Sequence, residues 1–301
     1  MFKYNPFFIL NFYQTEIHQM GQPTAPLNLQ TISILGCGWY GIELARELVA
    51  KGYTVKGSST TVQKLQLLAE QQIQPFLVNF EKDKESYDPL FFKTELLFVC
   101  IPPKRSEGQQ SDYLHKIQRI CTAAQLHKIS NLIFISSTAV YGDHNEEVTE
   151  LTVPNPETAS GKAILDAENL LSTHPGFNCT ILRFGGLVGP GRHPGRFFAG
   201  KTDIPNGLAP VNLIHLTDCI GISIHLVQHE ITNIIINACS PDHPAKQDFY
   251  VAAALNAKLP PPVFKNELLK WKLITGIQAP LLNYTYQVSN WASWFQQNNN
   301  L

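Results

Sequence analysis

A glycine-rich turn constrains the fold of this chain more than any other feature. The residues Gly36-Cys37-Gly38-Trp39-Tyr40-Gly41 follow an apolar run, Thr31–Leu35, and precede a stretch with apolar residues at helical spacing. A strand, a tight turn and a helix in this order bind the pyrophosphate of a dinucleotide, which the helix N-terminus faces. The sequence therefore predicts a dinucleotide site at Gly36, Gly38, Trp39, Tyr40 and Gly41. The alternative is a glycine turn that has lost its ligand.

Strands and helices alternate after this turn. Further apolar runs predict strands, and amphipathic stretches between them predict helices; the strands lie at residues 53–56, 75–80, 96–101, 131–135, 179–184 and 231–237. Such alternation is typical of an α/β protein with a Rossmann-type doubly wound parallel sheet, in which ligands bind at the carboxyl ends of the strands. We expect a flexible N-terminal extension at residues 1–29, a Rossmann domain at 30–240 and a small C-terminal substrate lobe at 241–301, which the excursion 185–212 joins.

Composition excludes several other kinds of protein. The 301 residues carry a formal net charge of −1 with no basic stripe, so we expect no nucleic-acid partner. No apolar segment reaches the roughly 18 residues that span a bilayer, which argues against a membrane partner. The six cysteines form no CxxC pair and indicate a reduced, cytoplasmic protein. We predict no metal site, and the sequence leaves a homodimer open.

The residues after the second strand bear on the choice between NAD and NADP. An acidic residue there bonds the ribose 2′-hydroxyl of NAD, but this chain has Ser58, Ser59 and Thr60 instead. These hydroxyls can bond a phosphate, and Lys56 or Lys64 can supply positive charge, so the sequence slightly favours NADP. The arginine typical of NADP sites is missing as well. The neighbouring Thr61 could equally cap the helix that follows.

Three motifs in order carry a family resemblance. The glycine turn is followed by Ser136-Ser137-Thr138-Ala139-Val140-Tyr141-Gly142 and later by an LRxGxxxGPG motif at residues 182–191. The chain resembles the extended short-chain dehydrogenase/reductases, the NAD-dependent epimerase/dehydratase family, over roughly residues 31–240. The resemblance implies an NAD(P) cofactor. Four more residues at or just after the ends of predicted strands are expected to contact the cofactor, namely Ile101, Pro102, Ser136 and Arg183. The alternative for Arg183 is a buried structural ion pair.

The catalytic residues of this family are only partly present. The resemblance assigns Ser137, four residues before the Tyr of VYG, to positioning the reacting oxygen of the substrate. Family members also use a Tyr and a Lys four residues apart on one helix, but no Tyr-x-x-x-Lys occurs in this chain, where Ser160 and Ile164 take those places. A serine is a weak acid or base near neutral pH. The chain therefore resembles the atypical branch of the family, and Ser137 has capping of nearby backbone as its alternative role.

Candidate substrate residues lie on and just after the excursion. Arg192 and His193, with Arg196 and Lys201, form a cationic group that could hold a phosphate or carboxylate, although solvated surface charge is the alternative. The segment that ends the excursion carries Asn212 and His215, and it also resembles the atypical branch. We predict contact of both with substrate, with a packed cleft-wall histidine as the alternative for His215.

These observations lead to one main hypothesis and two rivals. We expect an NAD(P)-binding oxidoreductase or epimerase that acts on a nucleotide-linked sugar or another small hydroxyl or carbonyl compound. Because the Tyr/Lys pair is missing, a non-catalytic dinucleotide-binding sensor or partner-binding module is the first alternative. A structural protein with a vestigial pocket is the second.

Overall fold

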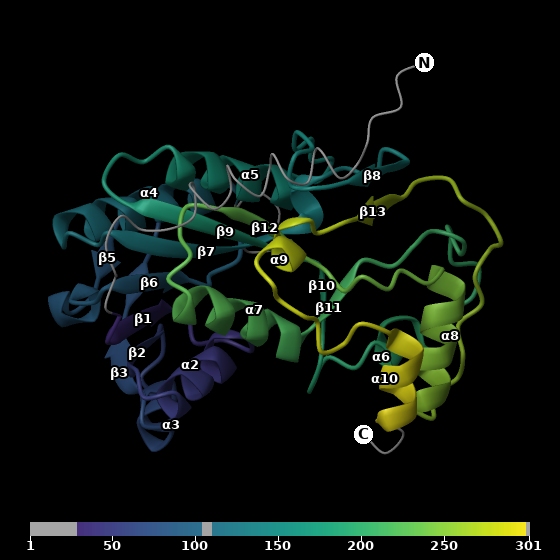
Figure 1. Cartoon of the computed structure of the whole chain (residues 1–301), viewed down its shortest axis with the longest axis horizontal. Helices are drawn as coiled ribbons and strands as arrows, with labels where there is room; N and C mark the ends of the chain where they lie inside the picture. The colour runs from purple at the N-terminus through teal and green to yellow at the C-terminus, as the bar shows by residue number, and fades with distance from the viewer. Residues whose placement is uncertain (1–28, 104–109, 299–301) are drawn as a thin grey trace.

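The computed structural model describes residues 29–103 and 110–298, and its centre is a seven-stranded parallel sheet (Figure 1). The predicted extension at residues 1–29 lies outside this part of the chain except for Leu29. The strand order is β3-β2-β1-β6-β7-β9-β12. The strands are β1 (Thr31–Leu35), β2 (Thr54–Ser59), β3 (Gln74–Leu77), β6 (Leu96–Val99), β7 (Asn131–Ser137), β9 (Asn178–Phe184) and β12 (Ile235–Ala238).

This topology confirms the predicted doubly wound Rossmann-type fold. The chain starts at β1, moves outward to β3, and then returns to β6 on the other side of β1. A parallel sheet reverses its direction of winding between β1 and β6, and ligands bind in the crevice outside the carboxyl ends of those strands. The ends of β2 and β7 lie beside the same crevice, because β2 pairs with β1 and β7 pairs with β6.

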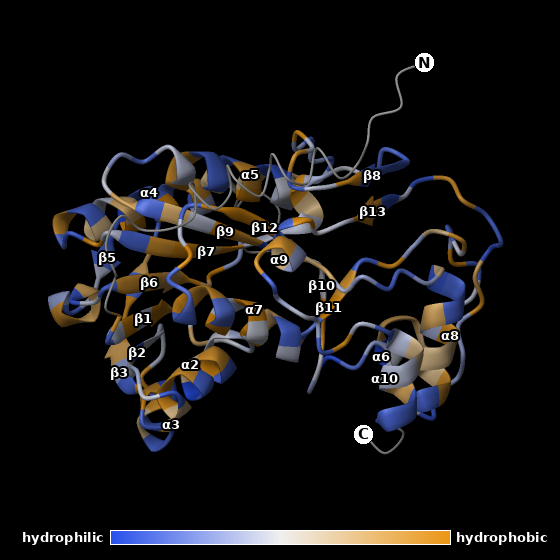
Figure 2. Ribbon diagram, in the orientation of Figure 1, coloured by the Kyte–Doolittle hydropathy of each residue, from blue (hydrophilic) through white to orange (hydrophobic). Residues whose placement is uncertain are grey.

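Helices cover both faces of the sheet. On one face, α2 (Gly41–Ala50) and α7 (Leu216–Gln228) bury aliphatic side chains, together with Leu68 from the short helix at residues 63–70. On the other face, α4 (Gln110–Leu126) packs beside α5 (Ala159–Ser172). The central strands between them bury mostly apolar side chains (Figure 2), with buried polar exceptions that include Lys56, Ser58 and Arg183. The remaining short elements near the sheet are α3 (Gln63–Glu70), β4 (Asn79–Phe80), β5 (Glu85–Ser86), η1 (Pro89–Phe92) and η2 (Thr138–Val140).

Some strand ends differ from the sequence prediction. The strand expected at residues 75–80 is divided, because β3 ends at Leu77 and β4 then pairs with β5 as a small antiparallel hairpin. The second and fifth strands run on to Ser59 and Ser137, where neighbouring strands extend the hydrogen-bonded ladder. The polar residues Ser58, Ser59, Ser136 and Ser137 therefore lie within strands. The sequence predicted them in the segments that follow those strands.

The C-terminal part of the chain forms a smaller packed unit beside the sheet. Its core includes Val188 and Val211 from the excursion and Phe249, Trp291 and Trp294 from the last helices. The excursion contains more regular structure than predicted, since residues 186–188 pair with residues 213–215. The elements are β10 (Gly186–Val188), α6 (Gly195–Phe198), β11 (Leu213–His215), α8 (Lys246–Asn256), α9 (Gln278–Leu281) and α10 (Trp291–Gln297).

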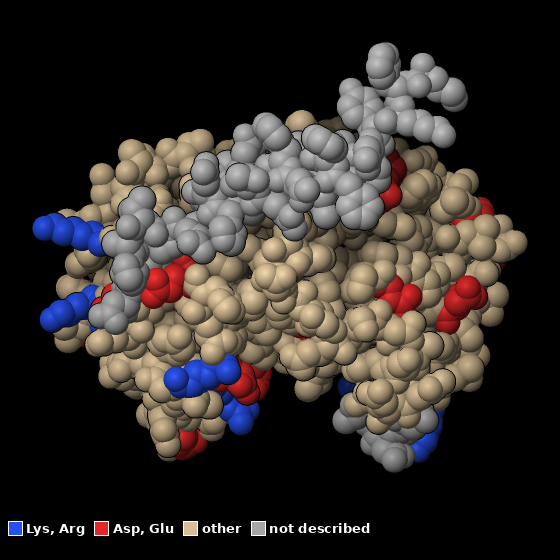
Figure 3. All heavy atoms as spheres, in the orientation of Figure 1, with Lys and Arg blue, Asp and Glu red and all other residues tan. Residues whose placement is uncertain are grey.

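The predicted domain boundary at residue 240 stays a prediction. The excursion packs on later residues, because the backbone oxygen of Ala253 lies 2.3 Å from where a Cβ on Gly195 would stand. Other late residues return to the sheet instead, since β13 (Lys272–Ile274) pairs with β8 (Glu146–Val148). On the face in Figure 3, lysines and arginines among the described residues lie at the left and lower edges, and uncharged side chains cover most of the rest.

A buried ion pair joins α5 to β9 beneath the cleft. Arg183 Nη2 lies 2.6 Å from Glu168 Oε2, and each side chain is only 3% exposed. The Ser136 hydroxyl also donates to Glu168, and Arg183 Nη1 donates to the Tyr141 hydroxyl at 2.6 Å. Every charged group in this network has partners, which a buried charge requires.

We predict that Arg183→Met lowers the free energy of unfolding by about 3–5 kcal/mol, because it leaves the Glu168 carboxylate buried without a cation. Urea denaturation measures this change. Arg46→Met is the matched control, since Arg46 pairs with Glu43 at 3.0 Å on the surface of α2 and should cost less than about 1 kcal/mol. Equal losses in the two variants would contradict the structural role of Arg183.

Candidate functional site

The glycine turn is held against the end of β2. Gly36 has a φ of +103°, a conformation that favours glycine, and its N–H donates to Ser58 Oγ at 2.9 Å. The next N–H, of Cys37, donates to the backbone oxygen of Ser58 at 3.0 Å. These two bonds fix the turn at the carboxyl edge of the sheet. Burial raises the pKa of the Cys37 thiol to about 12, so no thiolate faces the turn at neutral pH.

The turn leaves space where a phosphate would approach. A Cβ on Gly41 would stand 2.4 Å from the Gly36 oxygen, so only glycine lets α2 sit this close to β1. A Cβ on Gly38 would meet nothing within 4 Å. The N–H groups of Trp39, Tyr40 and Gly41 have no acceptor within the described ranges. They are the free donors of a helix N-terminus, whose dipole favours an anion.

A cavity of about 230 Å³ opens beside the turn. No Asp or Glu is among the residues that line it, whereas Lys64 and Lys116 are. The lining residues are Leu35, Gly36, Cys37, Gly38, Ser58, Ser59, Thr60, Lys64, Val78, Phe80, Cys100, Ile101, Pro102 and Lys116. A second cavity of about 380 Å³ shares Thr60, Pro102 and Lys116 with the first, so the two form one groove along the ends of β2 and β6.

This groove fits a dinucleotide. Three free N–H groups at a helix N-terminus suit a pyrophosphate, and the open space at Gly38 admits it. The apolar side chains of Val78, Phe80 and Ile101 offer a surface for a flat base. The exposed Lys64 in the first cavity supplies positive charge that suits a phosphate group. The residues of the site therefore match the group that the sequence predicts.

Comparison with known proteins agrees with this geometry. Residues 36–208 match a family model described as NAD(P)H-binding. The chain belongs to this NAD(P)H-binding family. It is 41% identical to protein YeeZ of Escherichia coli K12 over 266 residues, which cover 86% of this chain and 96% of YeeZ. It is 28% identical to the UDP-glucose 4-epimerase of Dictyostelium discoideum over 200 residues, 58% of this chain and 56% of that enzyme.

Solved structures share the fold. The UDP-glucuronic acid 4-epimerase of Bacillus cereus, in complex with UDP-glucuronic acid and NAD, superposes with a TM-score of 0.73 at 18% identity, covering 90% of this chain and 98% of the epimerase. The expected resemblance to the NAD-dependent epimerase/dehydratase family is confirmed, and so is NAD(P) as the class of cofactor.

The structure distributes the predicted cofactor residues over two environments. Most of them border the groove: Gly36, Gly38, Ser58, Ser59, Thr60, Ile101 and Pro102 line the first cavity. Tyr40 is buried, and its hydroxyl bonds Ser223 Oγ at 2.6 Å, so only its backbone is available to a ligand. Ser136 and Arg183 lie in the buried network with Glu168, the alternative foreseen for Arg183. Their side chains already have protein partners, which a contact with cofactor would have to replace.

The structure also separates the two lysines considered for charge. Lys56 is buried, and its ammonium donates to the backbone oxygens of Leu90 and Lys93, away from the first cavity. Burial is the main cause that lowers its pKa. Lys64 is exposed and lines the first cavity. Thr61 does not cap α3 through its side chain, because it bonds Ser59 instead.

The structure locates the residues that the sequence predicts at the family's catalytic positions. Ser137 ends β7 and caps η2, since its Oγ accepts from the Ala139 N–H at 3.2 Å. Ser160 lies in the first turn of α5, where its hydroxyl is 3.3 Å from that of Thr158, the helix N-cap. Ile164 is buried in the core. Lys162 is exposed on the same helix, about 200° around the axis from position 164.

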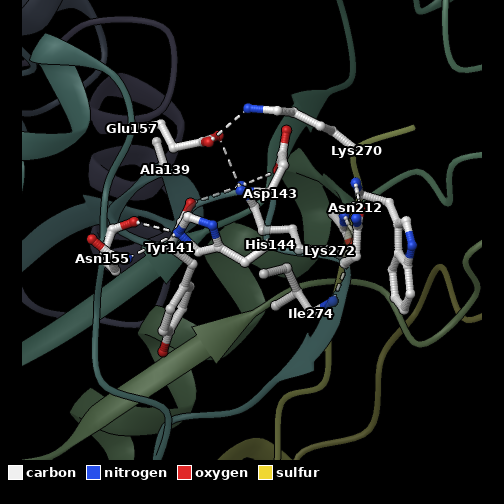
Figure 4. Close-up of polar contacts among 12 residues, drawn as sticks. Ala139, Tyr141, Asp143, His144, Asn155, Glu157, Asn212, Lys270, Lys272 and Ile274 are labelled. Carbon is white, nitrogen blue, oxygen red and sulfur yellow. Dashed lines mark hydrogen bonds and ion pairs between the residues drawn. The ribbon is translucent and has the colours of Figure 1, made fainter. Parts of the chain in front are cut away.

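The four predicted substrate residues do not form one cluster. Arg192 lies over the Trp39 ring, with its Cζ 4.4 Å from the ring centroid. His193 and His215 both approach Trp294, at 6.1 and 5.3 Å between ring centroids. Asn212 is held by β13: its Nδ2 donates to Lys272 O and its Oδ1 accepts from the Ile274 N–H, both at 2.8 Å (Figure 4).

The histidines near the cleft are mostly engaged. His193 Nδ1 accepts from the Gly195 N–H at 3.2 Å, and its Nε2 lies 3.2 Å from Asn256 Oδ1. His215 caps α7 through the Thr217 N–H, and burial lowers its pKa, so its ring is neutral at pH 7. These contacts favour the cleft-wall interpretation of His215. Asp218 anchors a later loop, accepting from the N–H groups of Gln287 and Val288 at 2.7 and 3.0 Å.

Sequence reasoning missed several lining residues of the groove. Val78, Phe80 and Cys100 were expected only as strand residues, and Lys116 only as part of a helix. The rule that ligands lie at the carboxyl ends of strands could have found Val78 and Phe80. Lys116 comes from α4, and only the packing of that helix brings it to the cavity.

Two further findings concern metals and membranes. His225 in the last turn of α7 and His229, the C-cap of that helix, are four residues apart and have ring centroids 4.3 Å apart. Within residues 29–103 and 110–298, however, no group of three or more His, Cys, Asp or Glu residues could hold a metal ion. In the same part of the chain, no helix is both long and apolar enough to span a bilayer.

We predict that Gly38→Val abolishes measurable binding of NADPH and NADH without unfolding the protein. The added side chain would occupy the space of the phosphate but meet no protein atom within 4 Å at its Cβ, so the free energy of unfolding should change by less than about 1 kcal/mol. Calorimetric titration and urea denaturation measure the two effects. Gly41→Val is the contrasting variant, which should destabilise the fold. Unchanged affinity in a folded Gly38→Val protein would refute the site.

Proposed function

We propose that this protein is an oxidoreductase or epimerase that uses NADP on a nucleotide-linked sugar. The observation that carries the proposal is the groove at the glycine turn, which offers free N–H groups and the exposed Lys64 to phosphates and has no carboxylate lining its first cavity. When bound, NAD(P) supplies hydride transfer. The protein's own residues would then bind, orient and shield the reactants.

The preference for NADP rests on the end of β2. The 2′-hydroxyl or 2′-phosphate of the adenosine ribose lies next to this strand end in Rossmann folds. Thr60 is exposed there and lines both cavities, and Lys64 has no acidic partner in the described part of the chain. An exposed ammonium beside hydroxyls suits a phosphate better than a ribose hydroxyl. The second cavity does contain Glu81, Asp83 and Asp112, of which Asp112 is paired with Lys82 at 3.2 Å.

The substrate class follows from similarity. The Dictyostelium relative is a UDP-glucose 4-epimerase, and the Bacillus cereus structure holds UDP-glucuronic acid with NAD. This chain shares the fold of the Bacillus cereus epimerase over 90% of its length. We therefore propose a sugar nucleotide as substrate, with another small hydroxyl or carbonyl compound as the wider class.

Ser137 is the residue we assign to the reacting oxygen. It is partly exposed at the carboxyl end of β7, and its Oγ uses a lone pair to cap η2. Its hydroxyl proton has no acceptor within the described residues, so it can be donated to a substrate oxygen. Neither α5 residue expected at the family's acid and base positions is a matched acid or base, because Ser160 is a weak one and Ile164 is apolar. Proton transfer would then depend on the substrate or on solvent.

The missing acid and base support a second candidate function. A non-catalytic, dinucleotide-binding sensor needs the groove but neither a Tyr nor a Lys on α5. The burial of Ile164 favours this alternative specifically, because it places an apolar side chain where the family's Lys would hold the ribose. The two candidates differ in whether NADPH is consumed, and a screen of nucleotide sugars with purified protein measures that directly.

We expect Lys64→Met to weaken NADPH binding about tenfold and to leave NADH binding nearly unchanged, since a charge-assisted bond to the 2′-phosphate would be lost. Fluorescence titration with both cofactors measures the ratio. Lys51→Met is the control, because Lys51 is exposed at the C-terminal end of α2 and does not line the cavities. Equal loss for both cofactors would sink the NADP assignment.

We expect Ser137→Ala to reduce turnover of an active sugar nucleotide about tenfold or more while cofactor affinity stays the same, because one donor to the reacting oxygen is removed. Ser172→Ala at the far end of α5 is the control. Steady-state kinetics with NADP or NADPH measure the effect. Unchanged turnover would remove Ser137 from the site, and absence of turnover in the unmodified protein would favour the sensor.

A further inference from the structure

A tight turn from the excursion lies on the glycine turn, although the two are about 150 residues apart in the chain. Trp39 Nε1 donates to the Pro190 oxygen at 2.7 Å, a bond between residues 151 positions apart. A Cβ on Gly189 would stand 3.2 Å from the Trp39 ring. The indole that follows Gly38 is therefore packed under residues 189–192, which we call the Pro-Gly turn.

The sequence of the Pro-Gly turn makes it rigid. Pro190 fixes its own φ, Gly191 has a φ of +74°, and the Arg192 N–H donates to the Gly189 oxygen at 2.8 Å. Pro at the second position and a positive φ at the third are the marks of a type II turn. The Trp39 bond adds a second constraint on the central peptide. Arg192 therefore starts from a well-fixed backbone.

The Arg192 side chain lies over Trp39 and has no acidic partner. Its Cζ is 4.4 Å from the ring centroid, close enough for a cation–π interaction. The residue is exposed, and no hydrogen bond or ion pair joins its guanidinium to another residue in the described ranges. A guanidinium that rests on an aromatic ring keeps its in-plane N–H donors available and matches phosphate oxygens. The stacking also reduces the side-chain entropy that binding would remove.

We propose that Arg192 binds a phosphate oxygen of the dinucleotide pyrophosphate. The Trp39 N–H is one of the three free donors at the N-terminus of α2, and the Trp39 ring carries Arg192, so one residue joins the amide and guanidinium donors. This inference rests on the dinucleotide site proposed above. It moves Arg192 from the substrate residues to the cofactor residues, and it makes the excursion part of the cofactor site.

The same chemistry could serve the diphosphate of a nucleotide-linked substrate, so the test must separate the two phosphates. Calorimetric titration measures the Kd of three probes, for the unmodified protein and for Arg192→Met. ADP-ribose carries the cofactor pyrophosphate, adenosine 2′,5′-bisphosphate carries the adenosine and 2′-phosphate without a pyrophosphate, and UDP carries the diphosphate of a sugar nucleotide.

We expect Arg192→Met to raise the Kd for ADP-ribose and NADPH about tenfold or more, as loss of a charge-assisted bond does, and to change the Kd for adenosine 2′,5′-bisphosphate less than about twofold. Arg192→Lys should recover part of the loss, because it restores charge without the planar fork. Arg46→Met, an exposed arginine that pairs with Glu43 on α2 and lines neither cavity, is the matched control and should change none of these values.

Unchanged affinity for ADP-ribose in Arg192→Met would overturn the proposal, and a fall in UDP affinity alone would return Arg192 to the substrate site. Equal losses for all three probes would indicate a general effect on the fold and also count against it. If the unmodified protein binds neither NADPH nor ADP-ribose, the dinucleotide site itself fails. If it binds both and the variant binds equally well, only the role of Arg192 fails.

Discussion

The close approach of α2 to the end of β1 is the constraint on which the candidate site depends. Gly41 has room for nothing larger than hydrogen beside the Gly36 oxygen, and this contact sets the position of the first turn of α2. Two bonds from the turn to Ser58 then fix it relative to β2. The free N–H groups consequently open on the crevice between the two halves of the sheet, where Rossmann folds hold phosphates.

Helix α5, where the family resemblance places a Tyr and a Lys, is firmly held against the sheet. The Glu168–Arg183 ion pair and the Thr158 cap hold α5 in place beside β7 and β9. On this helix the sequence predicts Ser160 and the buried Ile164 at the positions of the family's Tyr and Lys. Holding α5 against the sheet therefore does not require the Tyr/Lys pair.

The C-terminal part of the chain contributes to the cleft through a few specific anchors. Asp218, fully buried at the start of α7, holds the loop at Gln287 and Val288. Asn212 links the end of the excursion to β13, which itself pairs with β8. The Pro-Gly turn reaches the glycine turn at Trp39. Together these contacts place late residues beside a site whose first elements are formed by the opening third of the chain.

Local sequence determined the parts of this protein that depend on short-range physics. Alternating apolar runs and amphipathic stretches predicted the doubly wound sheet. The glycine turn predicted the cofactor class, because the tight turn at Gly36, the open approach at Gly38 and the close helix packing at Gly41 each require glycine. The absence of Tyr-x-x-x-Lys was equally visible. These features involve residues only a few positions apart.

Tertiary structure alone decided where the longer side chains lie. Arg183 and Lys56 look available from sequence, but packing buries the first against Glu168 and turns the second toward Leu90 and Lys93. Arg192 reaches Trp39 instead of joining His193, since a turn at residue 190 must first meet an indole 151 positions earlier. Such contacts depend on how distant elements pack, and no local pattern of residue types encodes them.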